Sequence, residues 1–276
     1  MREECAFRTS RETCALNIRD FGAAGDGQTD DTSAIQFALS SLPADGRLYF
    51  PPGRYLSRPL SLKSRITIEL AEGAVLLGCP DRERYPVVPG VVPDMDGGSE
   101  IHFGGFEGEA QPMYQSLLTA QYAHDIKIVG LGTVDGNGAN SHFWTKYREF
   151  PTARPRLLFF NRCENVTLHG VHVCDSPSWH IHPYYSKNIG MYDLRFSAPK
   201  DSPTPTPLNR NPAMAWRSSA VALRWATTAL PSNPGKSRSA PRSTPPPTAT
   251  PYATVSWSSD TGRWFWAARL ARGCGI

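Results

Sequence analysis

The 276-residue sequence has no run of 18 or more apolar residues, so it predicts no helix that crosses a membrane. Residues 1–16 carry early charges but neither the apolar segment nor the cleavage site of a secretory signal, and we expect them to be loose. We therefore expect a cytoplasmic location, with a secreted or periplasmic one as the alternative. The six cysteines include no CxxC pair, so we expect free thiols in a reducing compartment and no metal centre.

The last part of the chain lacks glutamate altogether. Residues 201–276 contain nine Lys or Arg and two Asp, a balance of +7, whereas the whole chain has a net charge of +4. The same segment holds eleven of the 25 prolines and five of the seven tryptophans. Its positive charges are scattered, which argues against an arm that binds nucleic acid or a membrane. We expect this Pro/Ser/Thr/Arg-rich tail to be irregular.

A nine-residue pattern occurs twice at a distance of 23 positions. Residues 165–173 (NVTLHGVHV) return as residues 188–196 (NIGMYDLRF), and both copies alternate apolar and polar side chains. Such alternation is typical of strands with one buried face. Weaker relatives occur at 125–134 and 66–77. A repeat of about two dozen residues made of short strands and corners predicts a β-solenoid, with Val166 and Ile189 stacked in register.

A helix is expected near residues 32–42, ahead of the first complete coil. Its apolar residues fall on one face: Ala34, Ile35, Ala38, Leu39 and Leu42. Asp30 or Asp31 is placed to cap its first N–H groups, and metal ligation by this acidic pair is the weaker alternative. A helix at this position would cover the open end of the solenoid.

Two stretches interrupt the coils: residues 80–120, which are dense in Pro, Gly and Asp, and residues 137–155. Insertions on one face of a solenoid commonly form its binding surface. Trp144, Tyr147 and Arg148 in the second stretch are candidates for a substrate rim, although plain loop packing is the stronger interpretation.

Four segments carry a resemblance to a known family. They are residues 20–36 (DFGAAGDGQTDDTSAIQ), 132–138 (GTVDGNG), 156–166 (RLLFFNRCENV) and 176–183 (SPSWHIHP). Together they resemble glycoside hydrolase family 28, the polygalacturonases, over about residues 17–203. The resemblance implies a right-handed parallel β-helix over 17–200, which hydrolyses the α-1,4-galacturonan of pectin with inversion and without a cofactor.

The family's catalytic phrases are missing from the sequence as it stands. The family places three aspartates, a Gly-His-Gly histidine and an Arg-x-Lys pair in the coils after Ser-Pro. Here Ser202-Pro203 is followed by residues 204–207 (TPTP) and none of those phrases. A one-base shift of plausible codons lets residues 204–211, 224–235 and 260–268 read Asn-Thr-Asp, Gly-Asp-Asp and His-Gly in order. We interpret residues 201–276 as an out-of-frame, truncated continuation.

Few individual residues qualify as site candidates. Trp179 and His182 are the candidates for substrate binding, by stacking on a sugar and bonding its carboxylate, and bracing of the coil corner is an equal alternative. Asn161 and Asn165 are expected to form a polar ladder, and His169, His172 and His180 to face outward. Asp135 and Asp193 lack a partner acid at a recognisable spacing, so no catalytic residue is assigned.

Two classes of function stay open. The first is a polygalacturonase-like hydrolase by descent, inactive because its catalytic aspartates are missing. The second is a non-catalytic β-helix that binds acidic polysaccharide or serves as a structural spike. In both, the expected partner is a pectic oligo- or polysaccharide, and neither nucleic acid nor a membrane.

Overall fold

The computed structural model describes residues 12–93, 100–104, 110–144, 152–199, 202–203, 223–225, 253–258 and 263–268. The chain divides into two compact units, Met1–Thr227 and Thr228–Ile276. Within the second unit, β22 (Ala253–Ser258) and β23 (Arg263–Ala268) pair as antiparallel strands. In the described part of the chain, no helix is long and apolar enough to span a membrane.

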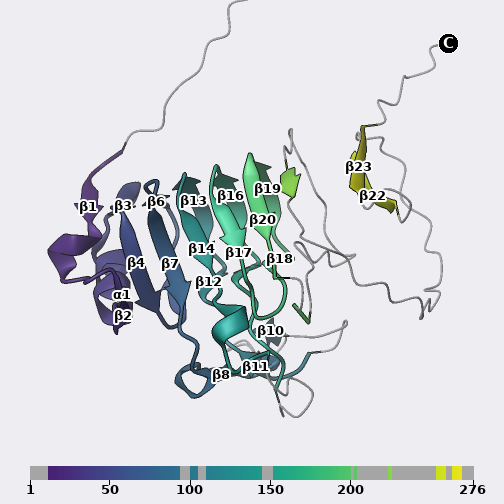
Figure 1. Cartoon of the computed structure of the whole chain (residues 1–276), viewed down its shortest axis with the longest axis horizontal. Helices are drawn as coiled ribbons and strands as arrows, with labels where there is room; N and C mark the ends of the chain where they lie inside the picture. Colours follow the sequence, from purple (N-terminus) through teal and green to yellow (C-terminus); the bar gives the residue numbers. More distant parts are fainter. Residues whose placement is uncertain are drawn as a thin grey trace, which may run out of the picture. The chain divides into compact units, whose positions relative to one another are not determined.

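The first unit is a right-handed parallel β-helix with three long sheets. Sheet A has the order β1 (Ala15–Asn17), β3 (Gly46–Phe50), β6 (Ile66–Leu70), β13 (His124–Gly130), β16 (Glu164–His169) and β19 (Lys187–Tyr192). Sheet B has the order β2 (Asp26–Asp30), β4 (Gly53–Ser57), β7 (Ala74–Gly78), β14 (Thr133–Asp135), β17 (His172–Cys174), β20 (Leu194–Ser197) and β21 (Leu223–Trp225). Sheet C has the order β5 (Leu60–Leu62), β12 (Leu118–Gln121), β15 (Leu158–Asn161) and β18 (Ile181–Tyr184). Figure 1 shows the strands of sheet B side by side in chain order.

Successive coils stack identical positions, and this register builds the core. Val166 pairs with Ile189 in the parallel ladder, as the repeat predicts, and Ile126 pairs with Val166 on the preceding turn. All three side chains are buried. Because side chains alternate between the two faces of a strand, each such column points inward and the next one outward. The inward columns of the three sheets merge into one continuous apolar core.

The expected cap is α1 (Thr32–Ser41), which buries Ile35, Ala38 and Leu39. Asp30 Oδ1 accepts a hydrogen bond from the N–H of Thr32 at 3.0 Å, so Asp30 has the expected capping role. Asp31 does not, because its carboxylate accepts from the N–H groups of Ala24 and Gly25 and makes no cap bond to the helix. Ahead of the helix, the short strand β2 follows η1 (Ile18–Phe21).

The predicted interruptions are present between the coils. The first contains η2 (Arg82–Arg84), β8 (Val87–Val88), β9 (Val91–Pro93), β10 (Glu100–His102) and β11 (Met113–Tyr114). It ends earlier than expected, because β12 already belongs to sheet C. The second contains η3 (Gly138–Asn140). Tyr85 and Tyr114 of the first stretch and Phe143 of the second form a second buried cluster together with Cys79.

A polar ladder is present, but its members are Asp125, Asn165 and Asn188, whereas the sequence predicted Asn161 and Asn165. Asn165 Nδ2 donates to Asp125 Oδ1, and Asn188 Nδ2 donates to Asn165 Oδ1, both at 3.0 Å. All three residues have left-handed backbone conformations, with φ between 53° and 57°. Asn161 is not part of this ladder, because it lies in β15 between Gln121 and Tyr184 on the neighbouring turns. The correct second asparagine was Asn188, at the repeat distance from Asn165.

The three histidines expected on the surface have three different environments. His169 is exposed. His172 is half-buried, its Nε2 lies 2.7 Å from Ser197 Oγ, and burial lowers its pKa. The prediction is wrong for His180, which is fully buried and packs edge-on against Phe196. Strand alternation could not place it, because His180 lies in the corner before β18.

One observation bears on the tail. β21 pairs in parallel with β20 in sheet B, whereas β19 and β18 are the last described strands of sheets A and C. Most of residues 204–276 lie outside the described residues, and the prediction that they form no regular coils stays a prediction.

A pocket on the outward face of sheet C

The outward face of sheet C carries a column of side chains from four successive turns. Ser61 pairs with Thr119, Thr119 with Phe159, and Phe159 with His182 in the parallel register. Their neighbours along each strand point into the core. The first three members of this column line a pocket with a volume of about 290 Å³.

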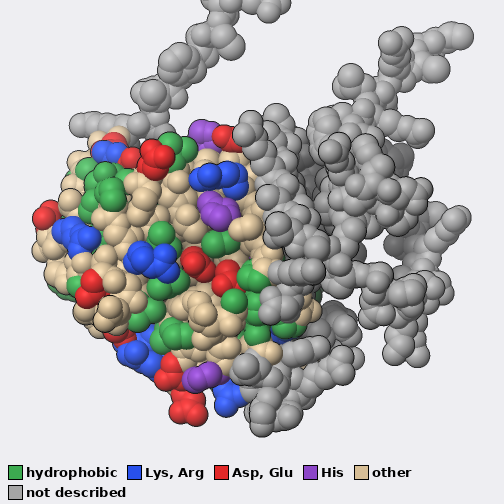
Figure 2. All heavy atoms as spheres, viewed as in Figure 1, with side chains coloured by type: hydrophobic (Ala, Val, Ile, Leu, Met, Phe, Trp, Pro, Cys, Tyr) green, Lys and Arg blue, Asp and Glu red, His purple; other side chains and the backbone are tan. Residues whose placement is uncertain are grey.

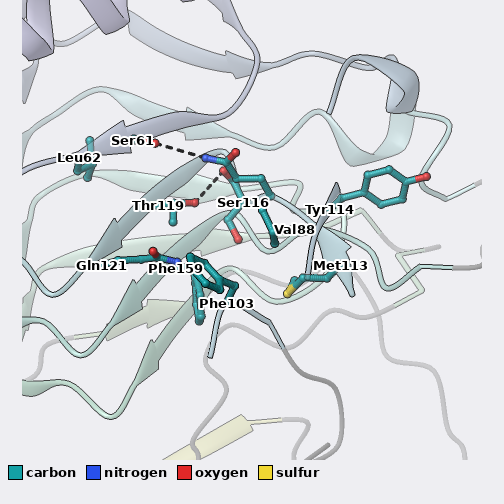
Figure 3. A pocket seen from close by; sticks show the side chains of 11 residues that line it. Ser61, Leu62, Val88, Phe103, Met113, Tyr114, Ser116, Thr119, Gln121 and Phe159 are labelled. Atoms are coloured by element: carbon teal, nitrogen blue, oxygen red, sulfur yellow. Dashed lines mark hydrogen bonds between the residues drawn. The ribbon is translucent and has the colours of Figure 1, made fainter. Parts of the chain in front are cut away.

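The pocket is roofed by the first interruption of the coils. Its lining residues are Ser61, Leu62, Val88, Phe103, Met113, Tyr114, Gln115, Ser116, Thr119, Gln121 and Phe159. Figure 3 shows these side chains, with Thr119 Oγ1 donating to the carbonyl oxygen of Ser116 at 3.2 Å and Gln115 Nε2 donating to Ser61 Oγ at 3.5 Å. Among the described residues, the polar groups of the lining are hydroxyls and amides, and none of them is an acid. Such a surface can bind hydroxyl-rich ligands by hydrogen bonds, and the lining residues that the structure describes include no carboxylate to act as a general acid or base.

The two predicted site residues lie together at one end of this column. The rings of Trp179 and His182 meet edge-to-face with centroids 5.3 Å apart, and His182 also packs 5.3 Å from Phe159. Trp179 is half-buried and His182 is 5% exposed. The carbonyl oxygen of Trp179 accepts from the N–H of Leu157, so its backbone also braces the coil. Their role in substrate binding stays a prediction.

A buried arginine joins this cluster, and sequence reasoning did not single it out. The guanidinium carbon of Arg156 lies 4.8 Å from the ring centroid of Trp179 and 5.6 Å from that of Phe159. Arg156 is 2% exposed, and burial lowers its pKa to about 9, so it stays charged at neutral pH. The available signal was a single Arg at the head of the apolar run 156–160.

Burial, followed by the charge of Arg156, lowers the pKa of His182 to about 2. The imidazole is therefore neutral at physiological pH and cannot offer a positive charge to a sugar carboxylate. Its Nδ1 makes no hydrogen bond within the described residues. The fixed positive charge at this end of the column is that of Arg156.

The two carboxylates considered in the sequence lie on different parts of the solenoid. Asp135 ends β14 in sheet B, where it accepts from the N–H of Asn137 at 2.8 Å and burial raises its pKa. Asp193 is exposed at the corner before β20, beside a second, open pocket of about 250 Å³ with Glu72 and Arg195. Neither lines the pocket of sheet C. They do not form the acid–base pair of a glycosidase.

Charge on the remaining surface is mixed. Figure 2 shows basic and acidic side chains interspersed over the face formed by sheet B. Within the described residues, no group of three or more His, Cys, Asp or Glu could hold a metal ion. Cys14, Cys79, Cys163 and Cys174 are free thiols.

Of the three residues considered for a substrate rim, only Trp144 lies within the described part. It packs against the second buried cluster beside Phe143, as plain loop packing predicts. Tyr147 and Arg148 lie outside the described residues.

Two family models match the chain. The model described as glycosyl hydrolases family 28 matches residues 96–221. The model described as rhamnogalacturonase A/epimerase, pectate lyase-like, matches residues 15–69. The two matches together cover most of the solenoid and leave residues 70–95 between them.

Individual relatives extend this similarity. A probable polygalacturonase of Vitis vinifera is 33% identical over 203 residues, which cover 71% of this chain and 39% of the relative. The plasmin and fibronectin-binding protein A of Streptococcus pneumoniae is 32% identical over 192 residues, or 67% of this chain and 24% of that protein. The solved exopolygalacturonase of Thermotoga maritima is 29% identical with a TM-score of 0.55, covering 68% of this chain and 48% of that one. The chain thus spans less than half the length of these three relatives.

Proposed function

Because the solenoid of this chain belongs to glycoside hydrolase family 28, we propose that the pocket of sheet C binds galacturonan, the acidic polysaccharide of pectin. The observation that carries the proposal is the composition of the pocket. Hydroxyl and amide groups line it, and the aromatic cluster around Arg156 adjoins it through Phe159. Sugar hydroxyls match the former, and a buried cation favours an anionic ligand nearby.

The second part of the proposal is that the chain as written does not hydrolyse this polymer. Inversion at a glycosidic carbon needs one carboxylic acid to protonate the leaving oxygen and one carboxylate to activate water, about 6.5–9.5 Å apart. Among the described residues, no acid lines the pocket, and Asp135 and Asp193 lie elsewhere. Loss of each role lowers the rate by about 10²–10⁴-fold.

The test compares two chains by two measurements, the binding of polygalacturonate and the release of reducing ends from it. Reducing ends released from polygalacturonate are measured for the present chain and for one whose reading frame after Pro203 is shifted by one base and continued. We expect binding without release for the first and release with inversion for the second. Turnover by the present chain equal to that of the shifted one would contradict the proposal.

A pocket variant locates the binding. Ser61 is exposed and lines the pocket, so Ser61→Phe should fill it and weaken binding of oligogalacturonate about tenfold or more. The matched control is Thr167→Phe, an outward position of β16 in sheet A. Equal affinities of both variants would place the binding site elsewhere.

A second candidate is a non-catalytic binding module. It is favoured by the lack of an acid among the described residues of the pocket lining and by the similarity to a pneumococcal protein whose name describes binding of plasmin and fibronectin. If the frame-shifted chain binds polygalacturonate without releasing reducing ends, this candidate replaces the hydrolase.

A further inference from the structure

Three successive corners beside the pocket carry large exposed side chains. Tyr122, Arg162 and Tyr185 follow directly on the last residues of β12, β15 and β18. The N–H of Tyr122 donates to the carbonyl of Asn161 at 2.9 Å, and that of Arg162 to the carbonyl of Tyr184 at 2.8 Å. These bonds stack the three corners one above another. We call the three side chains the corner strip.

The members of the corner strip contact one another along the solenoid. The guanidinium carbon of Arg162 lies 5.6 Å from the ring centroid of Tyr122 and 5.8 Å from that of Tyr185. Their backbones are left-handed, with φ of 50°, 52° and 48°. The two tyrosines are 50% and 46% exposed and are two of the five exposed large hydrophobic side chains in the described residues. Exposed cation–π contacts contribute only about 0.5–1 kcal/mol each, too little to explain such a concentration by stability alone.

The charge of Arg162 is available to an anion. In the part of the chain that the structure describes, no carboxylate lies within ion-pair distance of Arg162, whereas Arg47, Arg58, Arg65 and Arg84 all have acidic partners. Charged positions on the adjoining strands include Asp125 on β13 and the pair Glu164 and Lys187, which face each other in the β16–β19 register. A guanidinium between two rings can form a bidentate pair with a carboxylate while the rings contact the apolar face of a sugar.

We infer that the corner strip is a second binding site, outside the pocket, for a polysaccharide made of uronate sugars. The strip adjoins the pocket, because Gln121 lines the pocket and immediately precedes Tyr122. A chain of uronates that leaves the pocket at this side meets Tyr122 first and then Arg162. Each uronate supplies both groups that the strip recognises, a carboxylate and an apolar ring face. The inference rests on the proposed function for its class of ligand.

The experiment uses the full chain and variants suited to left-handed corners. One variant is Arg162→Asn, and another combines Tyr122→Asn with Tyr185→Asn. Asparagine tolerates positive φ, so the corners of both variants should fold unchanged. Arg162→Lys keeps the charge without the planar group. Arg195→Gln, an exposed position of β20, is the control for loss of one positive charge. Far-UV circular dichroism verifies that each variant is folded.

Affinity is measured for polygalacturonate and for the same polymer with its carboxylates methyl-esterified. We expect Arg162→Asn and the double tyrosine variant to bind polygalacturonate about fivefold more weakly, with Arg162→Lys in between and Arg195→Gln unchanged. The effect of Arg162→Asn should disappear with the esterified polymer and at high salt.

The outcomes separate this inference from the proposed function. If Ser61→Phe weakens binding and the corner variants do not, the corner strip is not a binding site and the pocket proposal stands. If the corner variants weaken binding and Ser61→Phe does not, the pocket proposal fails and the strip is retained. If the unmodified chain does not bind polygalacturonate, both are overturned.

Discussion

At the scale of single residues, His182 shows how a site candidate depends on its surroundings. The ring lies among Trp179, Phe159 and Tyr184, with Arg156 close by. Burial lowers the pKa of His182 from 6.5 to about 2. Between those two values the unfolded chain binds a proton that the folded chain does not, so stability is complete above pH 6.5 and falls as the pH decreases.

The consequence is measurable by urea unfolding at pH 7 and pH 5. Each pH unit below 6.5 should cost about 1.4 kcal/mol, or about 2 kcal/mol by pH 5. His182→Phe removes the titrating group. Between pH 7 and pH 5 its free energy of unfolding should therefore fall by about 2 kcal/mol less than that of the unmodified chain. His169→Gln changes an exposed histidine and should behave like the unmodified chain. An identical pH dependence of His182→Phe and the unmodified chain would contradict the buried, neutral state of His182.

At the scale of elements, the ladder of Asp125, Asn165 and Asn188 ties successive coils together at one corner. Asn165 is its middle member, since it donates to one neighbour and accepts from the other. Its φ of 57° is one that asparagine and glycine adopt more readily than other residues. Asn165 therefore contributes to stability in two ways, by its side-chain hydrogen bonds and by its tolerance of a left-handed backbone.

Substitutions at Asn165 should separate these contributions. Asn165→Gly keeps the backbone conformation and loses both side-chain hydrogen bonds, for an expected loss of about 1–2 kcal/mol. Asn165→Ala loses the bonds and adds left-handed strain, for about 1 kcal/mol more. Thr167→Ala, a partly exposed position of the same strand, is the control. In urea unfolding, Asn165→Ala should be the least stable of the variants, followed by Asn165→Gly. Equal stability of these two, Thr167→Ala and the unmodified chain would refute the ladder's contribution.

At the scale of the whole molecule, the chain consists of two units with separate sheets. Among the described strands, β22 and β23 pair only with each other, whereas β21 extends sheet B by pairing with β20. Loss of the second unit should therefore leave the strand pairing of the solenoid intact. Loss of β21 should expose the edge of β20.

Two truncated chains test this arrangement by thermal unfolding. A chain that ends at Thr227 should unfold within about 2 °C of the full chain. A chain that ends at residue 222 also lacks β21 and should unfold about 2–4 °C lower, which corresponds to about 1 kcal/mol for a domain of this size. A large loss of stability on removal of residues 228–276 alone would show that the solenoid depends on them.

Local patterns determined the architecture, because in a solenoid the repeat distance is also the distance to the stacked neighbour. The 23-residue spacing therefore gave the Val166–Ile189 pair, and the helical spacing of Ile35 and Leu39 gave the cap. The resemblance around Trp179 and His182 located one end of the outward column of sheet C. The burial of His180 was missed because this residue lies in a corner, where strand alternation carries no information.

Only the tertiary structure decided which polar groups share a surface. The pocket combines Ser61, Gln115 and Phe159, which lie in three separate segments of the chain. The charge states of Arg156 and His182 depend on how deeply each is buried, and residue type alone does not reveal this. The corner strip likewise joins Tyr122 to Tyr185 across 63 positions of sequence through Arg162. The sequence by itself determined the coil and its period, and the stacking of those coils decided which side chains meet on the outside.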